Sequence, residues 1–226
     1  MSRKAFTLAE ILITLTVISV VAALTIPTLL QNTNQAELKT ALKRDFADLS
    51  QATLSIKNDN GGSLVNVFRN GVGNALDSEN LKNAFKDKLS YIKECRSTNL
   101  WGGNGTGASA EGCWHAANNW SYLNGSKITG PINTSGLVLS NGTLVYFEVY
   151  SSNCTYTRGQ DSTVCSEIYF DVNGFKTPNT IGKDIFQAYI TGRADLVPSG
   201  GITEEAAKSC DPSGKGQNCT ALYLYQ

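Results

Sequence analysis

The sequence has few of the groups on which enzymes and metal sites depend. It contains one histidine, His115, and its six cysteines form no C-x-x-C pair, so the clustered ligands of a zinc site are missing. There is no G-x-S-x-G motif around a serine nucleophile. We therefore expect that the protein is not an enzyme and that His115 has a surface or loop-packing role.

Charge is scarce and balanced. Lys+Arg and Asp+Glu both number 19, so the basic excess that attracts nucleic acid is absent, and we expect no nucleic-acid partner. Charged residues make up only 17% of the chain, and Asn, Ser, Thr and Gly are abundant from about residue 58 onward. This composition suits an extracytoplasmic surface. The length of 226 residues allows one domain with an appendage.

The cysteines are even in number, which favours disulfides formed in an oxidising compartment. Six cysteines allow 15 connectivities. From proximity alone we expect neighbours to pair, and buried free thiols are the alternative. The expected pairs are Cys95–Cys113, Cys154–Cys165 and Cys210–Cys219.

One long segment has no charge at all. After Glu10 the next charged residue is Glu37, and Ile11–Leu30 is almost entirely apolar. As a helix this stretch is roughly 30 Å long, which matches the hydrocarbon thickness of a bilayer. Arg3 and Lys4 precede it, so the positive-inside rule places the N-terminus in the cytoplasm and the rest of the chain outside.

Two ordinary interpretations leave part of this segment unexplained. A secretory signal peptide could be cut after the small residues Val21-Ala22-Ala23, but the apolar run continues to Leu30. A plain signal anchor gives no reason for Glu10, because a carboxylate within a membrane segment is costly unless it is paired.

The stretch KAFTLAEILITL resembles the processing site of type IV prepilins and type II secretion pseudopilins. The resemblance covers about the first 30 residues. It implies that prepilin peptidase cuts between Ala5 and Phe6 and that the new N-terminal Phe6 is methylated. Glu10 then becomes the fifth residue, where the family has its glutamate, and Pro27 falls where the family has a helix-bending proline. Ala5 departs from the glycine that the family usually has before the cut.

The resemblance also gives Glu10 a physical role. Cleavage creates an α-amino group at Phe6, whose ordinary pKa of about 7.7–8.0 leaves it largely cationic at neutral pH. The Glu10 carboxylate of one subunit can pair with this ammonium on its neighbour when helices stack with an axial offset. An unpaired charge in a low dielectric is expensive and a paired one is tolerated, so Glu10 would fix the register of assembly. Pro27 either bends this helix or marks its exit from the membrane.

We expect an α+β fold with four segments: a leader (1–5), a transmembrane and assembly helix (6–30), its amphipathic continuation (31–57) and an extracytoplasmic head (58–226). The continuation is indicated by apolar residues at helical spacing, and NDNGG at 58–62 should end it. We expect a second helix from Asp77 or Ser78 to near Cys95. Asn99–Ser126 should be a disulfide-tied loop containing Trp101, Trp114 and Trp120.

Strand signals begin at Gly136. Apolar runs on both sides of Asn141-Gly142 predict a β-hairpin, and Asn173-Gly174 follows a second alternating run. KDIFQAYIT (183–191) is another candidate strand, and ALYLYQ (221–226) a last short one. Together these segments predict an antiparallel sheet of about four strands that packs on the helix.

A calcium site is one alternative for the loop after the second run. Asp171, Asn173, Asn179 and Asp184 offer carboxylate and amide oxygens, and major pseudopilins bind calcium in a loop of their sheet region. The spacing does not fit an EF-hand loop, and a hairpin followed by a loop explains the same residues. No other cofactor is expected.

These observations lead to a structural function. We expect a pilin-like subunit, most plausibly a type II secretion pseudopilin, that is held by one helix in the inner membrane and polymerised into a periplasmic or extracellular filament. Its partners would be prepilin peptidase, other pilin-like subunits, an inner-membrane assembly platform and membrane lipid. The alternative is a membrane-tethered extracytoplasmic binding module that uses its tryptophan-rich loop and forms no filament.

Overall fold

The computed structural model describes residues 7–69, 74–97, 107–130, 134–158, 161–193, 195–200 and 210–225. The chain divides into two compact units, Met1–Lys39 and Thr40–Gln226. We call them the N-terminal unit and the globular unit.

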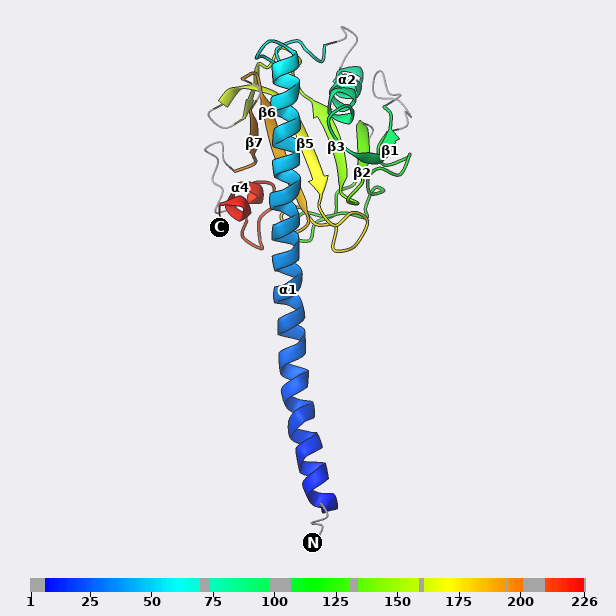
Figure 1. The fold of residues 1–226 in the computed structure, drawn as a ribbon, viewed down its shortest axis with the longest axis vertical. Helices are drawn as coiled ribbons and strands as arrows, with labels where there is room; N and C mark the ends of the chain where they lie inside the picture. Colours follow the sequence, from blue (N-terminus) through cyan, green and yellow to red (C-terminus); the bar gives the residue numbers. More distant parts are fainter. Residues whose placement is uncertain are drawn as a thin grey trace, which may run out of the picture. The chain divides into compact units, whose positions relative to one another are not determined.

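Helix α1 (Leu8–Asp59) begins in the N-terminal unit and ends in the globular unit. In the globular unit it lies over one face of the sheet (Figure 1). Its buried side chains recur at helical spacing, as the sequence predicted. The helix ends where Gly61 and Gly62 adopt positive φ angles of 68° and 93°, which a glycine reaches without steric strain. The buried apolar residues of this part are Leu42, Leu49, Ala52 and Ile56.

Among the described residues the sheet is seven-stranded and antiparallel, with the order β1-β2-β3-β5-β6-β7, and β4 pairs with β5. The sheet was expected to have about four strands. The hairpin around Asn141-Gly142 is confirmed as β2 and β3, and the strand predicted at 183–191 is confirmed as β6. The strands are β1 (Tyr91–Cys95), β2 (Ser135–Leu139), β3 (Leu144–Val149), β4 (Tyr156–Arg158), β5 (Asp161–Asp171), β6 (Ile185–Thr191) and β7 (Leu196–Pro198).

Both faces of the central strands are covered. On one face Phe147 of β3 packs against Phe85 of α2 (Asn74–Lys86), with ring centroids 5.2 Å apart. On the other face Tyr146 lies 4.7 Å from the ring of Trp114, in the loop between β1 and β2. Strand β2 is therefore buried along its whole length and lacks the alternation of a half-exposed strand.

Two predicted elements are wrong. The second helix was expected to continue to Cys95, but α2 ends at Lys86 and Tyr91–Cys95 form β1, paired with β2. The tail 221–226 was expected to be a strand, but Cys219–Leu224 form helix α4. In α4 the Thr220 hydroxyl accepts a hydrogen bond from the Gln187 backbone N–H at 3.0 Å, a contact between residues distant in sequence.

The predicted cysteine pairing is confirmed. Disulfides join Cys95–Cys113, Cys154–Cys165 and Cys210–Cys219. The first of them joins Cys95, the last residue of β1, to Cys113 in the loop that covers the sheet. This disulfide therefore fastens the loop to the end of the strand.

Candidate functional site

The N-terminal turn of α1 holds the carboxylate of Glu10. The Thr7 backbone N–H and hydroxyl both donate to Glu10 Oε2 at 2.8 Å, and the Glu10 N–H donates to the Thr7 hydroxyl at 3.2 Å. This reciprocal pattern is a capping box, which satisfies backbone donors that the first turn of a helix leaves free. The sequence analysis did not single out Thr7, although the pattern T-x-x-E before an apolar run is a recognised signal for it.

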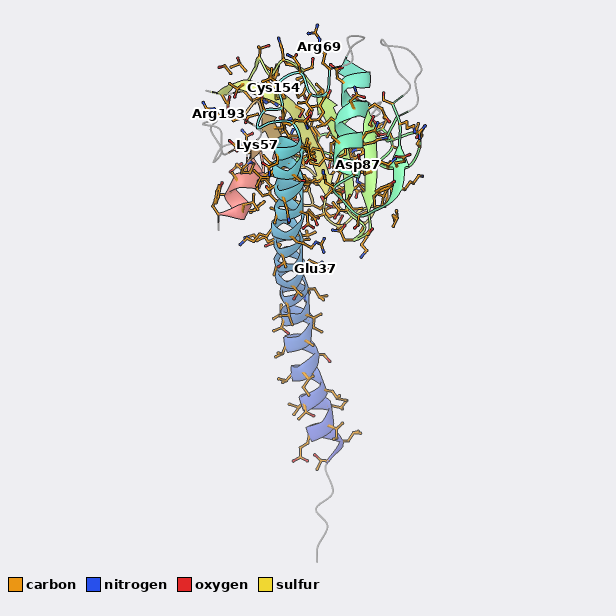
Figure 2. The ribbon with its side chains drawn as sticks, turned by 45° about the horizontal axis from the view of Figure 1, so that its top comes forward. Glu37, Lys57, Arg69, Asp87, Cys154 and Arg193 are labelled. Carbon is orange, nitrogen blue, oxygen red and sulfur yellow. A yellow bond between two sulfur atoms is a disulfide. The ribbon has the colours of Figure 1, made fainter. Side chains whose placement is uncertain are left out.

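The segment after Glu10 presents apolar side chains on every side. Leu8–Pro27 has a mean hydropathy of 2.3, is long enough to cross a membrane, and has none of its most apolar window buried within the chain. In Figure 2 the side chains drawn along this part of α1 are predominantly carbon. The hydroxyls among them donate to carbonyls of the preceding turn, so that they add little exposed polarity. They belong to Thr14, Thr16, Ser19 and Thr25.

Two of the predicted assembly residues can be located. Glu10 lies in the first turn of α1 and Pro27 lies inside the same helix. Ala5 and Phe6, the predicted processing and methylation positions, lie outside the described residues.

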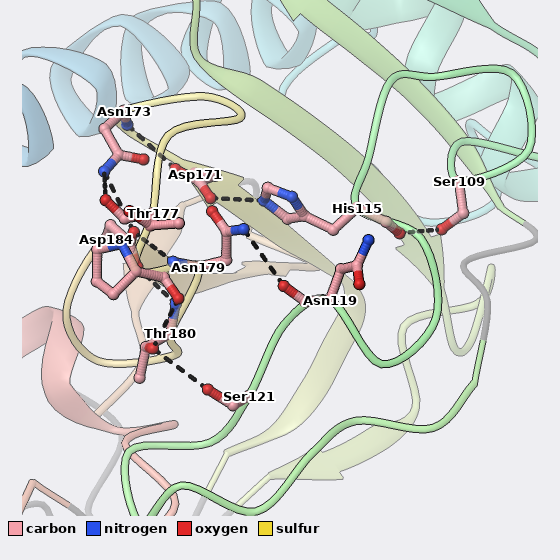
Figure 3. A network of polar contacts seen from close by, with 11 residues as sticks. Ser109, His115, Asn119, Ser121, Asp171, Asn173, Thr177, Asn179, Thr180 and Asp184 are labelled. Atoms are coloured by element: carbon pink, nitrogen blue, oxygen red, sulfur yellow. Dashed lines mark hydrogen bonds and ion pairs between the residues drawn. The ribbon is translucent and has the colours of Figure 1, made fainter.

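The four predicted calcium ligands are close together at the connection between β5 and β6 (Figure 3). The Asp184 carboxylate accepts the Asn179 N–H at 2.8 Å, the Thr180 N–H at 2.6 Å and the Asn173 side-chain amide at 3.2 Å. The Asp171 carboxylate accepts the Asn173 N–H at 3.1 Å. Both aspartates are fully buried.

Burial favours the neutral forms in this cluster. It raises the pKa of Asp171 to about 9, with a further contribution from the nearby Asp184 carboxylate. It also raises the pKa of Asp184, although the backbone N–H donors oppose this. His115 lies 2.8 Å from Asp171 (Nε2 to Oδ2), and burial lowers the His115 pKa. Both groups therefore favour their neutral forms, and the contact is better described as a hydrogen bond than as an ion pair.

These contacts fit a hydrogen-bonded turn better than a cation site. Calcium takes six to eight oxygen ligands, whereas each carboxylate here already accepts N–H donors. Within the described residues no three His, Cys, Asp or Glu side chains are grouped so that they could hold a metal ion. Two amide oxygens of the cluster, Asn173 Oδ1 and Asn179 Oδ1, are buried without a hydrogen-bond partner in the described structure. Calcium binding stays a prediction, and a calcium-dependent melting temperature would test it.

The tryptophan loop forms part of the core. Trp114 is 1% exposed and Trp120 is 3% exposed, and their rings meet edge to face with centroids 5.7 Å apart. His115 is also buried and not at the surface, so of its two expected roles the packing one applies. Trp101 lies outside the described residues. Two of the three tryptophans that the binding-module alternative needs are therefore unavailable to a ligand.

The sequence analysis missed a pair of neighbouring acidic residues in the sheet, of which Glu167 is fully buried. Glu148 of β3 and Glu167 of β5 are direct cross-strand partners, and the Tyr150 hydroxyl donates to Glu167 at 2.6 Å. The Gln187 amide also donates to Glu167, and Arg158 Nη2 lies 3.9 Å from it. Burial raises the pKa of Glu167 to about 7. A glutamate directly before the apolar run Ile168-Tyr169-Phe170 was the signal that could have identified it.

Comparison of the chain with protein-family models, curated proteins and solved structures finds no match.

Proposed function

We propose that this chain is a pilin-like filament subunit, and specifically a type II secretion pseudopilin. It is made with a short basic leader, cut before Phe6 by prepilin peptidase, methylated there and held in the inner membrane by α1. An assembly platform then transfers it into a filament of pilin-like subunits.

The observation that carries this proposal is the position of Glu10. It is an acidic residue in the first turn of a helix whose segment Leu8–Pro27 is predominantly apolar, with none of its most apolar window buried within the chain. Such a surface needs either lipid or other apolar helices around it, and an acid within it needs a cation. The α-amino group of a processed neighbour provides that cation in the filament, and Thr7 gives the carboxylate hydrogen bonds in the lone subunit.

The tethered binding module is the weaker explanation. It accounts for the apolar segment but gives no reason for Glu10, and Trp114 and Trp120 are buried. A type IV pilus or DNA-uptake filament uses the same assembly chemistry, so it remains a variant of the proposal.

N-terminal mass spectrometry of the native protein tests the processing step. We expect a mature chain that begins at methylated Phe6, because the junction Ala5–Phe6 and the Glu10 that follows match the prepilin pattern. An intact Met1 or a start near Leu24 would refute this.

Glu10→Ala tests the assembly step. Loss of one member of a buried charge pair costs about 3 kcal/mol, so we expect roughly a hundredfold weaker subunit association with normal membrane insertion. Glu37→Ala, which removes the next acid along the chain, is the matched control and should assemble normally. Equal filament yield from both variants, measured by electron microscopy of sheared fractions, would favour the tethered module.

A further inference from the structure

Three loop segments of the globular unit meet in one cluster. Ser121 forms β-bridges with Lys127 and with Thr180, which lies in the β5–β6 connection. The Leu123 N–H donates to the carbonyl of Lys215, in the segment before α4, at 3.2 Å. We call these segments, 121–127, 173–183 and 211–216, the basal loops.

The surface of the basal loops is cationic. Four lysines on them are exposed, and none forms an ion pair with another described residue. Asp211 is an exposed acid in these segments, and its carboxylate accepts hydrogen bonds from Ser213. Asp184 is fully buried and does not offset the surface charge. The four lysines are Lys127, Lys176, Lys183 and Lys215.

An exposed aromatic ring lies among these lysines. Phe175 is 55% exposed and precedes Lys176 in the turn after β5. One edge of its ring meets His115 at a centroid distance of 5.6 Å, and it borders an open cavity of about 410 Å³ together with Lys127. One exposed apolar residue is ordinary by itself. An exposed aromatic ring beside exposed lysines is instead typical of surfaces that bind at the boundary of anionic lipid bilayers.

The basal loops lie at the end of the globular unit where α1 enters it (Figure 1). Near that end of the globular unit, Asp45 of α1 accepts hydrogen bonds from two residues of the β2–β3 turn, Asn141 at 2.9 Å and Thr143 at 2.6 Å. Gly174 abuts the same turn, since a Cβ added to it would lie 2.6 Å from the Gly142 carbonyl oxygen.

The chain between the apolar segment and this end is short. From Leu30 to Thr40 a helix rises roughly 15 Å. The polar headgroup region of a leaflet is roughly 5–8 Å thick, and charges act over a Debye length of about 8–10 Å. A connection of this length allows the basal loops to reach the headgroups of a bilayer that α1 spans.

We propose that the basal loops dock on the anionic phospholipid surface of the membrane in which α1 is anchored. The lysines attract phosphate headgroups, and Phe175 enters the interface between headgroups and acyl chains. The inference rests on the membrane anchoring in the proposed function and not on filament formation. Docking would hold the unassembled subunit close to the bilayer, and entry into a filament would require its release.

The test uses the full-length chain reconstituted into vesicles, with a fluorophore on a cysteine introduced at Thr177→Cys and quenched by doxyl-labelled lipid. A second label at Asn58→Cys, at the far end of α1, is the positional control. We expect strong quenching at 177 and little at 58 in vesicles containing phosphatidylglycerol. In vesicles of phosphatidylcholine alone the docked-to-free ratio should fall at least tenfold, because the attraction of several lysines is lost.

Charge variants separate the surface from the anchor. Replacing the four lysines together by Gln should lower the docked-to-free ratio at least tenfold in phosphatidylglycerol vesicles, and replacing the same four by Arg should preserve it. Phe175→Ala should reduce quenching and Phe175→Trp should keep it. Melting curves of each variant verify that the fold is intact.

Two results would overturn the inference in distinguishable ways. Quenching at 177 that is equal in the two lipid compositions, or unchanged in the Gln variant, would refute docking and leave the proposed function standing. A chain that alkaline carbonate extracts from the vesicles is not anchored, which would refute both.

Discussion

At the scale of single residues, Glu167 lies where burial disfavours its charged form. Its carboxylate is fully buried, faces Glu148 across the strands and receives hydrogen bonds from Tyr150 and Gln187. Arg158, the nearest cation among its described contacts, is 3.9 Å away. Burial raises the pKa of Glu148 as well. Protonation therefore favours the folded state of this pair.

We predict that Glu167 makes the globular unit less stable as pH rises. Its folded pKa of about 7 exceeds the ordinary value of 4.5, so its stabilising protonation is complete below pH 4.5 and is lost as pH rises through 7. The whole difference corresponds to roughly 3 kcal/mol. Glu167→Gln should remove this contribution, which urea unfolding of wild type and variant at pH 5 and pH 8 measures.

Glu37→Gln, at an exposed position, is the control for that series and should leave the pH dependence unchanged. A Glu167→Gln variant with the same pH slope as the wild type would contradict the assignment.

Residue chemistry also limits what the sequence could reveal about the candidate sites. Glu10 and Pro27 could be found because a motif and a long uncharged run surround them. The contact between His115 and Asp171 joins residues 56 positions apart, and no local pattern predicts such a pairing. The same holds for the carboxylates of Glu148 and Glu167, which only strand register brings together.

At the scale of elements, the contact between α1 and the β2–β3 turn depends on one carboxylate. Asp45 is fully buried and accepts hydrogen bonds from Thr143, Asn141 and the neighbouring Arg44. Burial raises its pKa, and the hydrogen bonds from Arg44 and Thr143 oppose the change, so the polar contacts offset part of the cost of burying the acid.

We predict that Asp45→Ala destabilises the globular unit by about 3 kcal/mol, because it leaves the buried Thr143 hydroxyl without its acceptor. Asp48→Ala changes an exposed acid of the same helix and should stay within about 0.5 kcal/mol of wild type. Chemical unfolding followed by circular dichroism measures both. Equal losses in the two variants would mean that general helix charge, and not this contact, is responsible.

Elements were predictable where their pattern was long. Helix α1 extends over many turns with consistent spacing, and the Asn141-Gly142 hairpin has a strong turn signal, so both were found. The predictions for the short elements were wrong. Helix α4 has six residues, too few for periodicity to separate a helix from a strand, and its form depends on Cys219 and on the contact of Thr220 with β6. Strand β1 was assigned to the preceding helix because Leu89 and Ile92 continue the helical spacing of α2.

At the scale of the whole molecule, the two units differ in what they bury. The core residues lie in Thr40–Gln226, whereas none of the most apolar window in Leu8–Pro27 is buried. Cooperative folding needs the core, and the exposed segment adds nothing to it within one chain.

We predict that a truncated chain, Thr40–Gln226, folds as a soluble monomer whose melting temperature is within a few degrees of that of the full chain in detergent. The three disulfides all lie inside it and should form normally. Size-exclusion chromatography and thermal circular dichroism would measure this. An unfolded or aggregated fragment would show that residues before Thr40 contribute to the core.

The sheet that is covered on both faces has an evolutionary consequence. Central strands such as β2 and β6 are buried from end to end, so a polar replacement on either side meets a packed layer. Sequence drift should therefore accumulate in the connections and on the outer side of α1.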